Sequence, residues 1–118
     1  MLKMSIIEPC DSPYASPVVI VKKSDNTNRV CIDYRKINRI TVFDSEPPGN
    51  PDYIFDNLSG AKFFSKIDLS KGYWQIKVRQ ECKPYTAFVC SEELFSFNRM
   101  PFGMVNSGSS FSKMMRKL

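Results

Sequence analysis

Histidine is absent from the chain, and the four cysteines include no Cys-x-x-Cys pair. Protein zinc sites are built from closely spaced cysteine and histidine ligands, so the sequence offers no zinc motif, and it has no histidine to act as a general base. Unpaired thiols are typical of reducing compartments. We therefore expect the protein to lie inside the cell, in the cytoplasm or the nucleus.

Long apolar runs are missing as well. No stretch approaches the roughly 18 consecutive apolar residues that a membrane span requires, and the N-terminus has no basic segment followed by an apolar signal-peptide core. We expect no membrane partner. With 118 residues, 42% of them hydrophobic, the chain can form one ordinary domain with a core. Its net charge of +5 is compatible with nucleic acid but does not require it.

The most informative feature that is present is one carboxylate, Asp68, inside the run FFSKIDLSKGYWQI at residues 63–76. The apolar content of this run predicts two buried strands, at 64–69 and 74–78, with a break between them. Aspartate is disfavoured within strands and costly to bury without a partner. Either Asp68 caps the next turn or pairs with a neighbouring lysine, or it is a ligand for a hard cation such as Mg²⁺.

The rest of the pattern is typical of an α+β fold with antiparallel strands and a few helices. Apolar and β-branched residues predict a first hairpin from strands 18–22 and 29–33, and a second from strands 86–90 and 95–97. The turn of the first hairpin is flanked by three cations, Lys22, Lys23 and Arg29. They are either a solvated tip that protects the strand edges from aggregation or part of a binding site.

Proline, glycine and asparagine mark the remaining boundaries. Three prolines and a glycine within residues 45–51 exclude regular structure and predict a crossing loop. Residues 52–58 predict a short helix that ends at Gly60. Asn106 is a favourable N-cap, and the apolar spacing after it predicts a helix that runs to the end of the chain.

Four segments together resemble a known family: SPYASPVVIVKK at 12–23, RVCIDYRKIN at 29–38, the Asp68 run, and MPFGMVNSG at 100–108. In order and spacing they resemble the reverse transcriptases (RNA-directed DNA polymerases) of gypsy-class LTR retrotransposons and retroviruses. The resemblance extends from about Ile6 to the last residue. It implies a partial right-hand polymerase fold made of the fingers and part of the palm.

The resemblance also implies a division of the chain and a set of partners. Fingers-like segments are implied at 1–43 and 76–101, and palm-like segments at 44–75 and 102–118. The implied partners of the complete enzyme are an RNA or DNA template-primer and deoxynucleotide triphosphates, with Mg²⁺ as the cofactor.

The first set of roles that the resemblance implies concerns charge. The first hairpin resembles the fingers hairpin that closes over the incoming nucleotide, so Lys22 or Lys23, together with Arg29, would contact the triphosphate. Asp68 matches the first catalytic aspartate of the palm. The backbone carbonyl of Leu69 would add a second ligand for the metal ion.

The second set concerns the shape of the nucleotide site and the path of the template. Tyr73 matches the aromatic residue beneath the sugar, whose ring leaves no room for a 2′-hydroxyl and so selects deoxyribonucleotides. It can be a core aromatic at the same time. Phe102 and Gly103 match the turn beneath the base and sugar. Arg35 and Asn106 are implied to lie along the template-primer.

Part of the implied catalytic site is not in the sequence. Two-metal phosphoryl transfer needs more than one carboxylate, and the family supplies the others from a Tyr-x-Asp-Asp hairpin that these 118 residues do not contain. After Asp68 the only acidic residues are Glu81, Glu92 and Glu93. We therefore expect the isolated chain to be inactive, and to be either partly disordered near Leu118 or self-associated through an uncovered edge.

The alternative is a domesticated, non-catalytic remnant that binds nucleic acid or a protein partner. Departures from the family pattern, such as Asn28 in place of a tryptophan, are compatible with it. Glu93 stands where a hairpin glycine is usual, and a positive φ at that position would cost about 1 kcal/mol or more.

Overall fold

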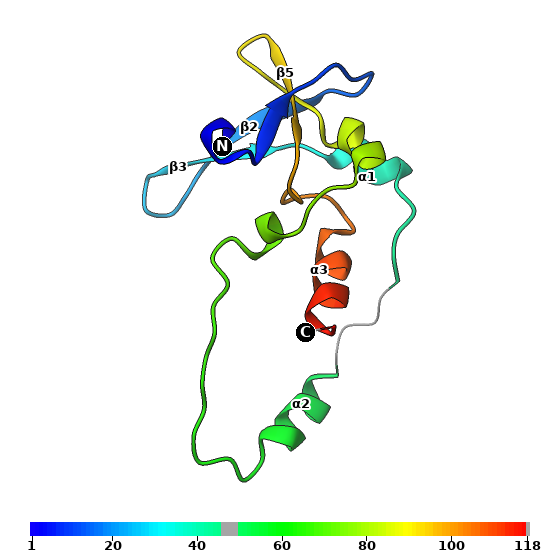
Figure 1. The fold of residues 1–118 in the computed structure, drawn as a ribbon. Helices are drawn as coiled ribbons and strands as arrows, with labels where there is room; N and C mark the ends of the chain where they lie inside the picture. The colour runs from blue at the N-terminus through cyan, green and yellow to red at the C-terminus, as the bar shows by residue number, and fades with distance from the viewer. Residues whose placement is uncertain (46–49, 118) are drawn as a thin grey trace.

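The structure of the chain is a computed structural model that describes residues 1–45 and 50–117. Its backbone forms one five-stranded sheet accompanied by short helices (Figure 1). The elements along the chain are the 3₁₀-helix η1 (Leu2–Met4), strands β1 (Ile7–Pro9), β2 (Ser16–Lys22) and β3 (Asn28–Ile32), helices α1 (Arg35–Ile40) and α2 (Pro51–Leu58), 3₁₀-helices η2 (Gly72–Gln75) and η3 (Gln80–Thr86), strands β4 (Phe88–Cys90) and β5 (Glu93–Phe97), and helix α3 (Ser107–Met115).

The strand order is β1-β5-β4-β2-β3. Three of the pairings are antiparallel, as the sequence predicts, but β2 runs parallel to β4. The predicted predominance of antiparallel pairing is confirmed among the described residues. The parallel pair joins strands from separate hairpins, and the sequence does not reveal which of these strands become neighbours. The hydrophobic core lies on the sheet and comprises Ile6, Ile7, Phe88, Phe95 and Phe97.

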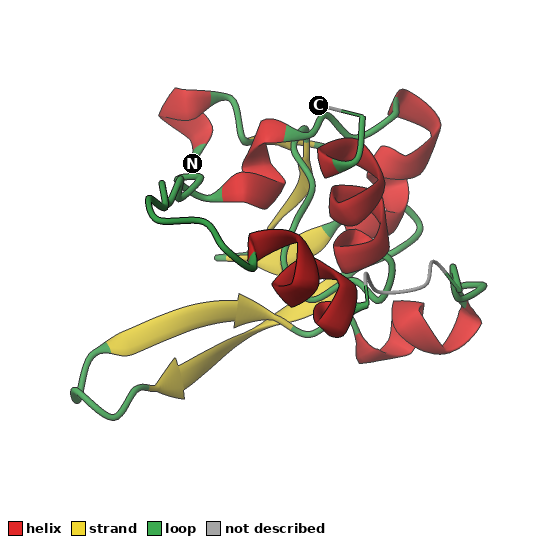
Figure 2. Ribbon diagram, turned by 90° about the horizontal axis from the view of Figure 1, so that it is seen from below, coloured by secondary structure: helices red, strands yellow, loops and turns green. Residues whose placement is uncertain are grey.

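The first predicted hairpin is confirmed. Strands β2 and β3 pair from Val18↔Ile32 to Lys22↔Asn28, and the hairpin projects from the body of the molecule (Figure 2). Its turn is stabilised by Asp25, whose carboxylate accepts a hydrogen bond from the Thr27 backbone N–H at 2.9 Å. Asn26 takes the positive φ of 61° that the turn requires, and asparagine tolerates this conformation better than most residues.

The second hairpin is also present, as β4 and β5, but its strained position was predicted wrongly. Glu93 lies in β5, whereas positive φ angles occur at Ser91 (51°) and Glu92 (67°). The turn lies earlier than expected because the pairing of Cys90 with Glu93 leaves only two residues between the strands. A two-residue hairpin with positive φ at both central positions matches the right-handed twist of its strands.

The segment that carries Asp68 does not form the predicted strands. Residues 63–69 have no regular secondary structure, and residues 72–75 form η2, followed by a single β-bridge between Lys77 and Arg99. Among the described residues no strand pairs with 63–69, so its apolar side chains face solvent: Phe63 is 94% exposed and Ile67 is 86% exposed. The strand prediction was wrong because a strand needs a neighbour as well as a suitable composition.

Residues 41–45 and 50–71, here called the arm, leave the body and return to it with α2 at the far end (Figure 1). The radius of gyration is 17.2 Å, compared with roughly 13.5 Å for a compact chain of this length. Helix α2 begins where the Asn50 side chain accepts a hydrogen bond from the Asp52 N–H at 3.0 Å, and the chain turns at Gly60 with φ of 82°, as predicted. Of the predicted crossing loop at 45–51, residues 46–49 lie outside the described residues. The loop prediction was wrong at Pro51, which begins α2, because proline is tolerated in the first turn of a helix.

Helix α3 is present, but Asn106 does not cap it in the expected way. Asn106 occupies the N-cap position, yet its side chain makes no capping hydrogen bond. Instead its Nδ2 donates to the Val42 carbonyl at 2.8 Å and its Oδ1 accepts from the Asp44 N–H at 3.0 Å. The prediction was wrong because the 42–44 segment, distant in sequence, competes for the same side chain.

None of the helices in the described part of the chain is long and apolar enough to cross a membrane.

Candidate functional site

Four of the residues singled out from the sequence line one hollow of about 380 Å³: Asp68, Leu69, Tyr73 and Phe102. They come from three places in the chain: the 67–69 segment, η2, and the turn before α3. Helix α3 completes the hollow with Phe111 and Met115. The tertiary structure therefore brings a carboxylate and an aromatic surface together, although more than thirty residues separate Asp68 from Phe102.

The floor of this hollow is a group of aromatic rings. Tyr73 stacks on Phe102 with ring centroids 4.9 Å apart and an interplanar angle of 25°, and it meets Phe111 at 5.3 Å. Gly72 allows this approach, since a Cβ atom there would lie 2.9 Å from the Phe111 ring. Tyr73 thus packs against other aromatics and also borders the hollow, so the two interpretations of this residue are compatible.

The turn that carries Phe102 and Gly103 is held by a residue to which the sequence analysis gave no role. Asn38, on α1, donates from Nδ2 to the Gly103 carbonyl at 2.9 Å and accepts from the Val105 N–H at 2.9 Å. Gly103 has φ of 94° and lies beside the Ile32 carbonyl at the base of the first hairpin. The only sequence signal for Asn38 is its place in the 29–38 motif, because its partners are about 65 residues away.

A second set of bonds fixes α3 against the arm. Ser109 Oγ donates to the Asp44 carbonyl at 3.1 Å, and Lys113 Nζ pairs with the Asp44 carboxylate at 2.6 Å. Together with Asn106, these contacts make Asp44 the point at which the arm joins the helix. Asn106 is therefore partly engaged in structure, which leaves its predicted contact with a template untested.

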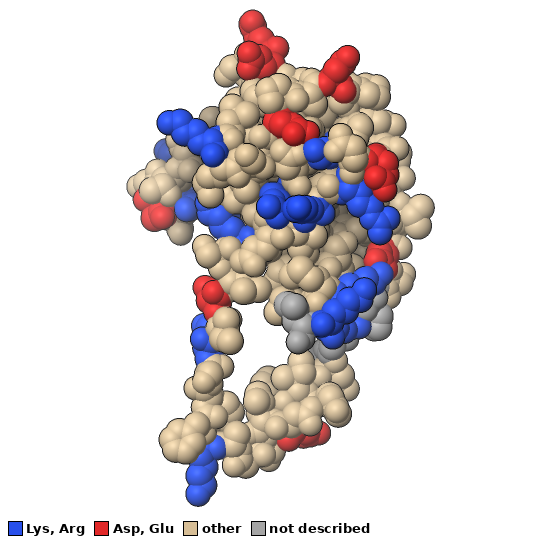
Figure 3. Space-filling model, in the orientation of Figure 1, with Lys and Arg blue, Asp and Glu red and all other residues tan. Residues whose placement is uncertain are grey.

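The hairpin cations do not line the hollow. Lys22, Lys23 and Arg29 are exposed on β2, its turn and β3, and their side chains make no hydrogen bond or ion pair with other described residues. The hairpin tip and the 61–69 segment lie on the same side of the molecule (Figure 1). Lys and Arg side chains also lie across the middle of the face that Figure 3 shows, and acidic side chains lie toward its top, along its sides and at its lower end.

Arg35 is engaged by a neighbour. Its guanidinium makes a two-pronged ion pair with Asp33, with Nη2–Oδ2 and Nε–Oδ1 distances of 2.7 and 2.9 Å. The hydrogen bonds from the Arg35 side chain and backbone lower the pKa of Asp33 from 3.8 to about 2. The Arg35 side chain is 83% exposed, so it is accessible from solvent even though one edge of its guanidinium is occupied.

The donor set at Asp68 fits part of a magnesium site. Mg²⁺ prefers oxygen ligands and is commonly held by one or two carboxylates, with water and substrate phosphates completing its shell. Asp68 is exposed in the hollow, and the Leu69 carbonyl follows it directly in the chain. Within residues 1–45 and 50–117 no group of three or more Asp, Glu, Cys or His could hold a metal ion. These residues therefore fit one ion and not a two-ion clamp.

Comparison with known proteins identifies a family with matching sequence. Residues 20–118 match the model of the family described as reverse transcriptase (RNA-dependent DNA polymerase). The chain is 40% identical over its whole length to the retrovirus-related Pol polyprotein from transposon 297 of Drosophila melanogaster. It is 33% identical over 98% of its length to the enzymatic polyprotein of cauliflower mosaic virus, strain D/H.

Solved structures agree with these relatives. The fold matches the foamy viral protease-reverse transcriptase in complex with an RNA/DNA hybrid with a TM-score of 0.86 and 28% identity, over 98% of this chain and 16% of that one. The foamy viral protease-reverse transcriptase dRH in complex with double-stranded DNA matches with a TM-score of 0.85 and 28% identity, over 98% of this chain and 20% of that one.

The chain spans only a small part of the relatives it matches: 12% of the transposon 297 polyprotein and 18% of the viral polyprotein. Both retrotransposons and viruses are represented, so the narrower gypsy-class assignment stays a prediction. The predicted partial polymerase fold is supported by the likeness to the foamy viral structures. The chain belongs to the reverse transcriptase family and corresponds to part of the reverse transcriptase region of retroelement Pol polyproteins.

Proposed function

We propose that this chain provides the nucleotide-binding surface and the first metal-binding carboxylate of a polymerase that extends a primer with deoxynucleotides. The observation that supports this most directly is the hollow in which Asp68 lies next to the Tyr73–Phe102 ring pair. A carboxylate beside a flat aromatic surface matches the two ends of a nucleotide, since the phosphates need a metal ion and the sugar and base need an apolar contact.

In this proposal Asp68 and the Leu69 carbonyl hold Mg²⁺. The bound ion would neutralise charge on the phosphates and lower the pKa of the attacking primer hydroxyl. The Tyr73 ring packs against Phe102 and Phe111. In this proposal it would give the sugar a rigid floor and would leave no space for a 2′-hydroxyl. Its rigidity matters because a mobile ring would not exclude an oxygen atom.

Lys22, Lys23 and Arg29 would bind the triphosphate from the side of the hairpin. They have no competing partner among the described residues, and a charge-assisted hydrogen bond to phosphate is stronger than a neutral one. Because they do not line the hollow, the hairpin would have to approach a bound nucleotide. Gly103 lies close to the Ile32 carbonyl at the hairpin base, so hairpin and turn would move together.

The first test uses a longer chain that includes a Tyr-x-Asp-Asp hairpin, because a single carboxylate cannot hold two ions. Asp68→Asn in that chain should abolish Mg²⁺-dependent primer extension while template-primer binding stays within about twofold of the unsubstituted chain, since only the metal ligand changes. Asp56→Asn on α2, another exposed carboxylate, is the matched control and should retain activity. Continued extension by the Asp68→Asn protein would remove this residue from its role.

The second test concerns the choice of sugar. Tyr73→Val should allow the longer chain to incorporate ribonucleotides, because the ring that excludes the 2′-hydroxyl is gone. Tyr73→Phe keeps the ring and should keep the selectivity, so it separates the effect of the ring from that of the hydroxyl. If both variants discriminate against ribonucleotides as the parent does, Tyr73 is only a packing residue.

The non-catalytic alternative is decided by the same assays. A longer chain that binds template-primer but never extends it, at any Mg²⁺ concentration, would favour a remnant that binds nucleic acid.

A further inference from the structure

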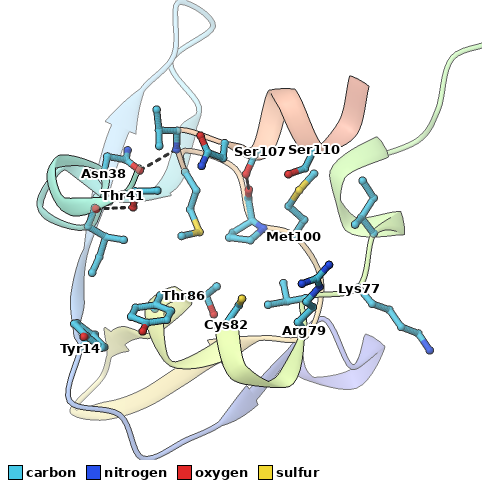
Figure 4. A pocket seen from close by; sticks show the side chains of 18 of the residues that line it. Tyr14, Asn38, Thr41, Lys77, Arg79, Cys82, Thr86, Met100, Ser107 and Ser110 are labelled. Atoms are coloured by element: carbon cyan, nitrogen blue, oxygen red, sulfur yellow. Dashed lines mark hydrogen bonds between the residues drawn. The ribbon is translucent and has the colours of Figure 1, made fainter. Parts of the chain in front are cut away.

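A second cavity, of about 790 Å³, lies between α1, η3 and α3 and shares no lining residue with the hollow at Asp68. Cavities of this size hold drug-sized molecules. Much of its wall is aliphatic, and Tyr14 and Tyr85 add an aromatic wall, with ring centroids 4.9 Å apart. Figure 4 shows the Cys82 side chain at the base of the cavity, with its sulfur facing the interior.

Several polar groups in this wall are already satisfied within the protein. Thr41 Oγ1 donates to the Ile37 carbonyl at 2.8 Å, and Ser107 Oγ donates to the Pro101 carbonyl at 2.9 Å. Thr86 Oγ1 donates to the Lys83 carbonyl and accepts from the Phe97 N–H. These hydroxyls hold the fold together and present little hydrogen-bonding capacity to a ligand.

The charge of the wall is one-sided. Its lining includes two cations, Lys77 and Arg79, and none of the described lining residues is acidic. The Arg79 guanidinium makes no hydrogen bond or ion pair with other described residues, and Figure 4 shows it reaching toward the cavity while Lys77 extends away from it. An unpaired guanidinium beside an apolar cavity is complementary to an anionic group attached to an apolar body.

We propose that this cavity binds a small organic anion with an apolar, ring-containing body, whose anionic group pairs with Arg79. The aromatic wall of Tyr14 and Tyr85 contacts the rings of the ligand, and Lys77 adds positive potential at the mouth. This binding is independent of the proposed polymerase chemistry, so its test needs no activity.

The test uses a matched pair of fluorescent probes, 8-anilinonaphthalene-1-sulfonate and its uncharged analogue N-phenyl-1-naphthylamine. They share one apolar body, and only the first carries an anion. Arg79→Gln should lower the binding affinity of the sulfonate probe roughly tenfold and that of the neutral probe less than about twofold, because only the sulfonate probe forms a charge-assisted hydrogen bond. Arg39→Gln, which removes an exposed α1 cation outside the lining, should change neither affinity by more than about twofold.

Alkylation of cysteines locates the probe, since exposed aromatics on the arm could also bind it. A saturating concentration of the sulfonate probe should slow the reaction of Cys82 with iodoacetamide at least about fivefold and leave exposed Cys90 unaffected, as measured by peptide mass spectrometry. Cys82→Phe should narrow the cavity and weaken this binding while the circular dichroism spectrum is retained.

Two results would overturn the proposal. One is an equal loss of affinity for both probes in the Arg79→Gln variant, which would mean that the cavity does not recognise the anionic group. The other is unchanged alkylation of Cys82 under saturating probe, which would place the binding elsewhere even if Cys82→Phe fails to fold.

Discussion

Replacing Asn38 with alanine should loosen the turn that carries Phe102 and Gly103. The Asn38 side chain makes two hydrogen bonds of 2.9 Å to this turn, one to the Gly103 carbonyl and one from the Val105 N–H. Among the described residues, no other side chain bonds to these two backbone groups. The substitution therefore removes the direct link between α1 and the segment before α3.

The magnitude follows from the two bonds. Each hydrogen bond contributes about 1 kcal/mol net to stability in a partly exposed site. Alanine offsets about 0.5 kcal/mol of the loss, because its helix propensity exceeds that of asparagine. We expect Asn38→Ala to lower the free energy of unfolding by about 1.5 kcal/mol. Asn38→Asp keeps the acceptor for Val105 but loses the donor to Gly103, so its loss should be of similar size or larger, because the carboxylate then faces a carbonyl.

Urea denaturation followed by circular dichroism measures this difference, provided that the m-value is unchanged. Arg39→Ala is the matched control: it lies next to Asn38 on α1, is exposed, and should shift the free energy by less than about 0.5 kcal/mol. Equal effects of the Asn38 and Arg39 substitutions would refute the claim that Asn38 fastens the turn.

Two glycines and one ion pair give further tests. Gly72→Ala should destabilise the chain by about 1 kcal/mol, because the new Cβ would lie 2.9 Å from the Phe111 ring. At Gly108 a Cβ would meet no atom closer than 3.7 Å, so Gly108→Ala should stabilise α3 by about 0.5 kcal/mol. Urea denaturation measures both changes in the free energy of unfolding, and changes of the same sign would contradict the packing argument. Arg35→Gln should raise the pKa of Asp33 from about 2 toward 3.8. Because the folded-state pKa is the lowered one, the stabilisation by this pair is present above about pH 4 and is lost as the pH falls toward 2; an NMR titration in which the Asp33 pKa does not move would contradict it.

Local features of the fold could be predicted from the sequence because neighbouring residues decide them. The turn at residues 23–27 follows from Asp25 and Asn26, whose side chains suit a tight reversal, and the end of α2 follows from Gly60, which adopts a positive φ. The family could be predicted for a related reason, since it depends on the order of four motifs. The assignment of 1–43 and 76–101 to the fingers and of the rest to the palm stays a prediction.

The candidate site could be predicted in its members but not in its geometry. Asp68, Leu69, Tyr73 and Phe102 were singled out one by one, and the structure places all four around one hollow. Lys22, Lys23 and Arg29 were assigned to the same nucleotide, yet they lie on a separate hairpin. No motif records the distance between two parts of a chain.

The sequence by itself determined the hairpins, the family and the identity of the candidate carboxylate. Local backbone preferences depend on adjacent residues, and the order of the motifs can be seen along the chain. Only the tertiary structure decided that residues 63–69 are not a strand, that Asn106 bonds to the 42–44 segment, and that Asn38 fastens a turn about 65 residues away. The reason is that a strand, a cap or a clamp needs a partner for its hydrogen-bonding groups. When that partner comes from a distant segment, chain packing selects it and local sequence does not.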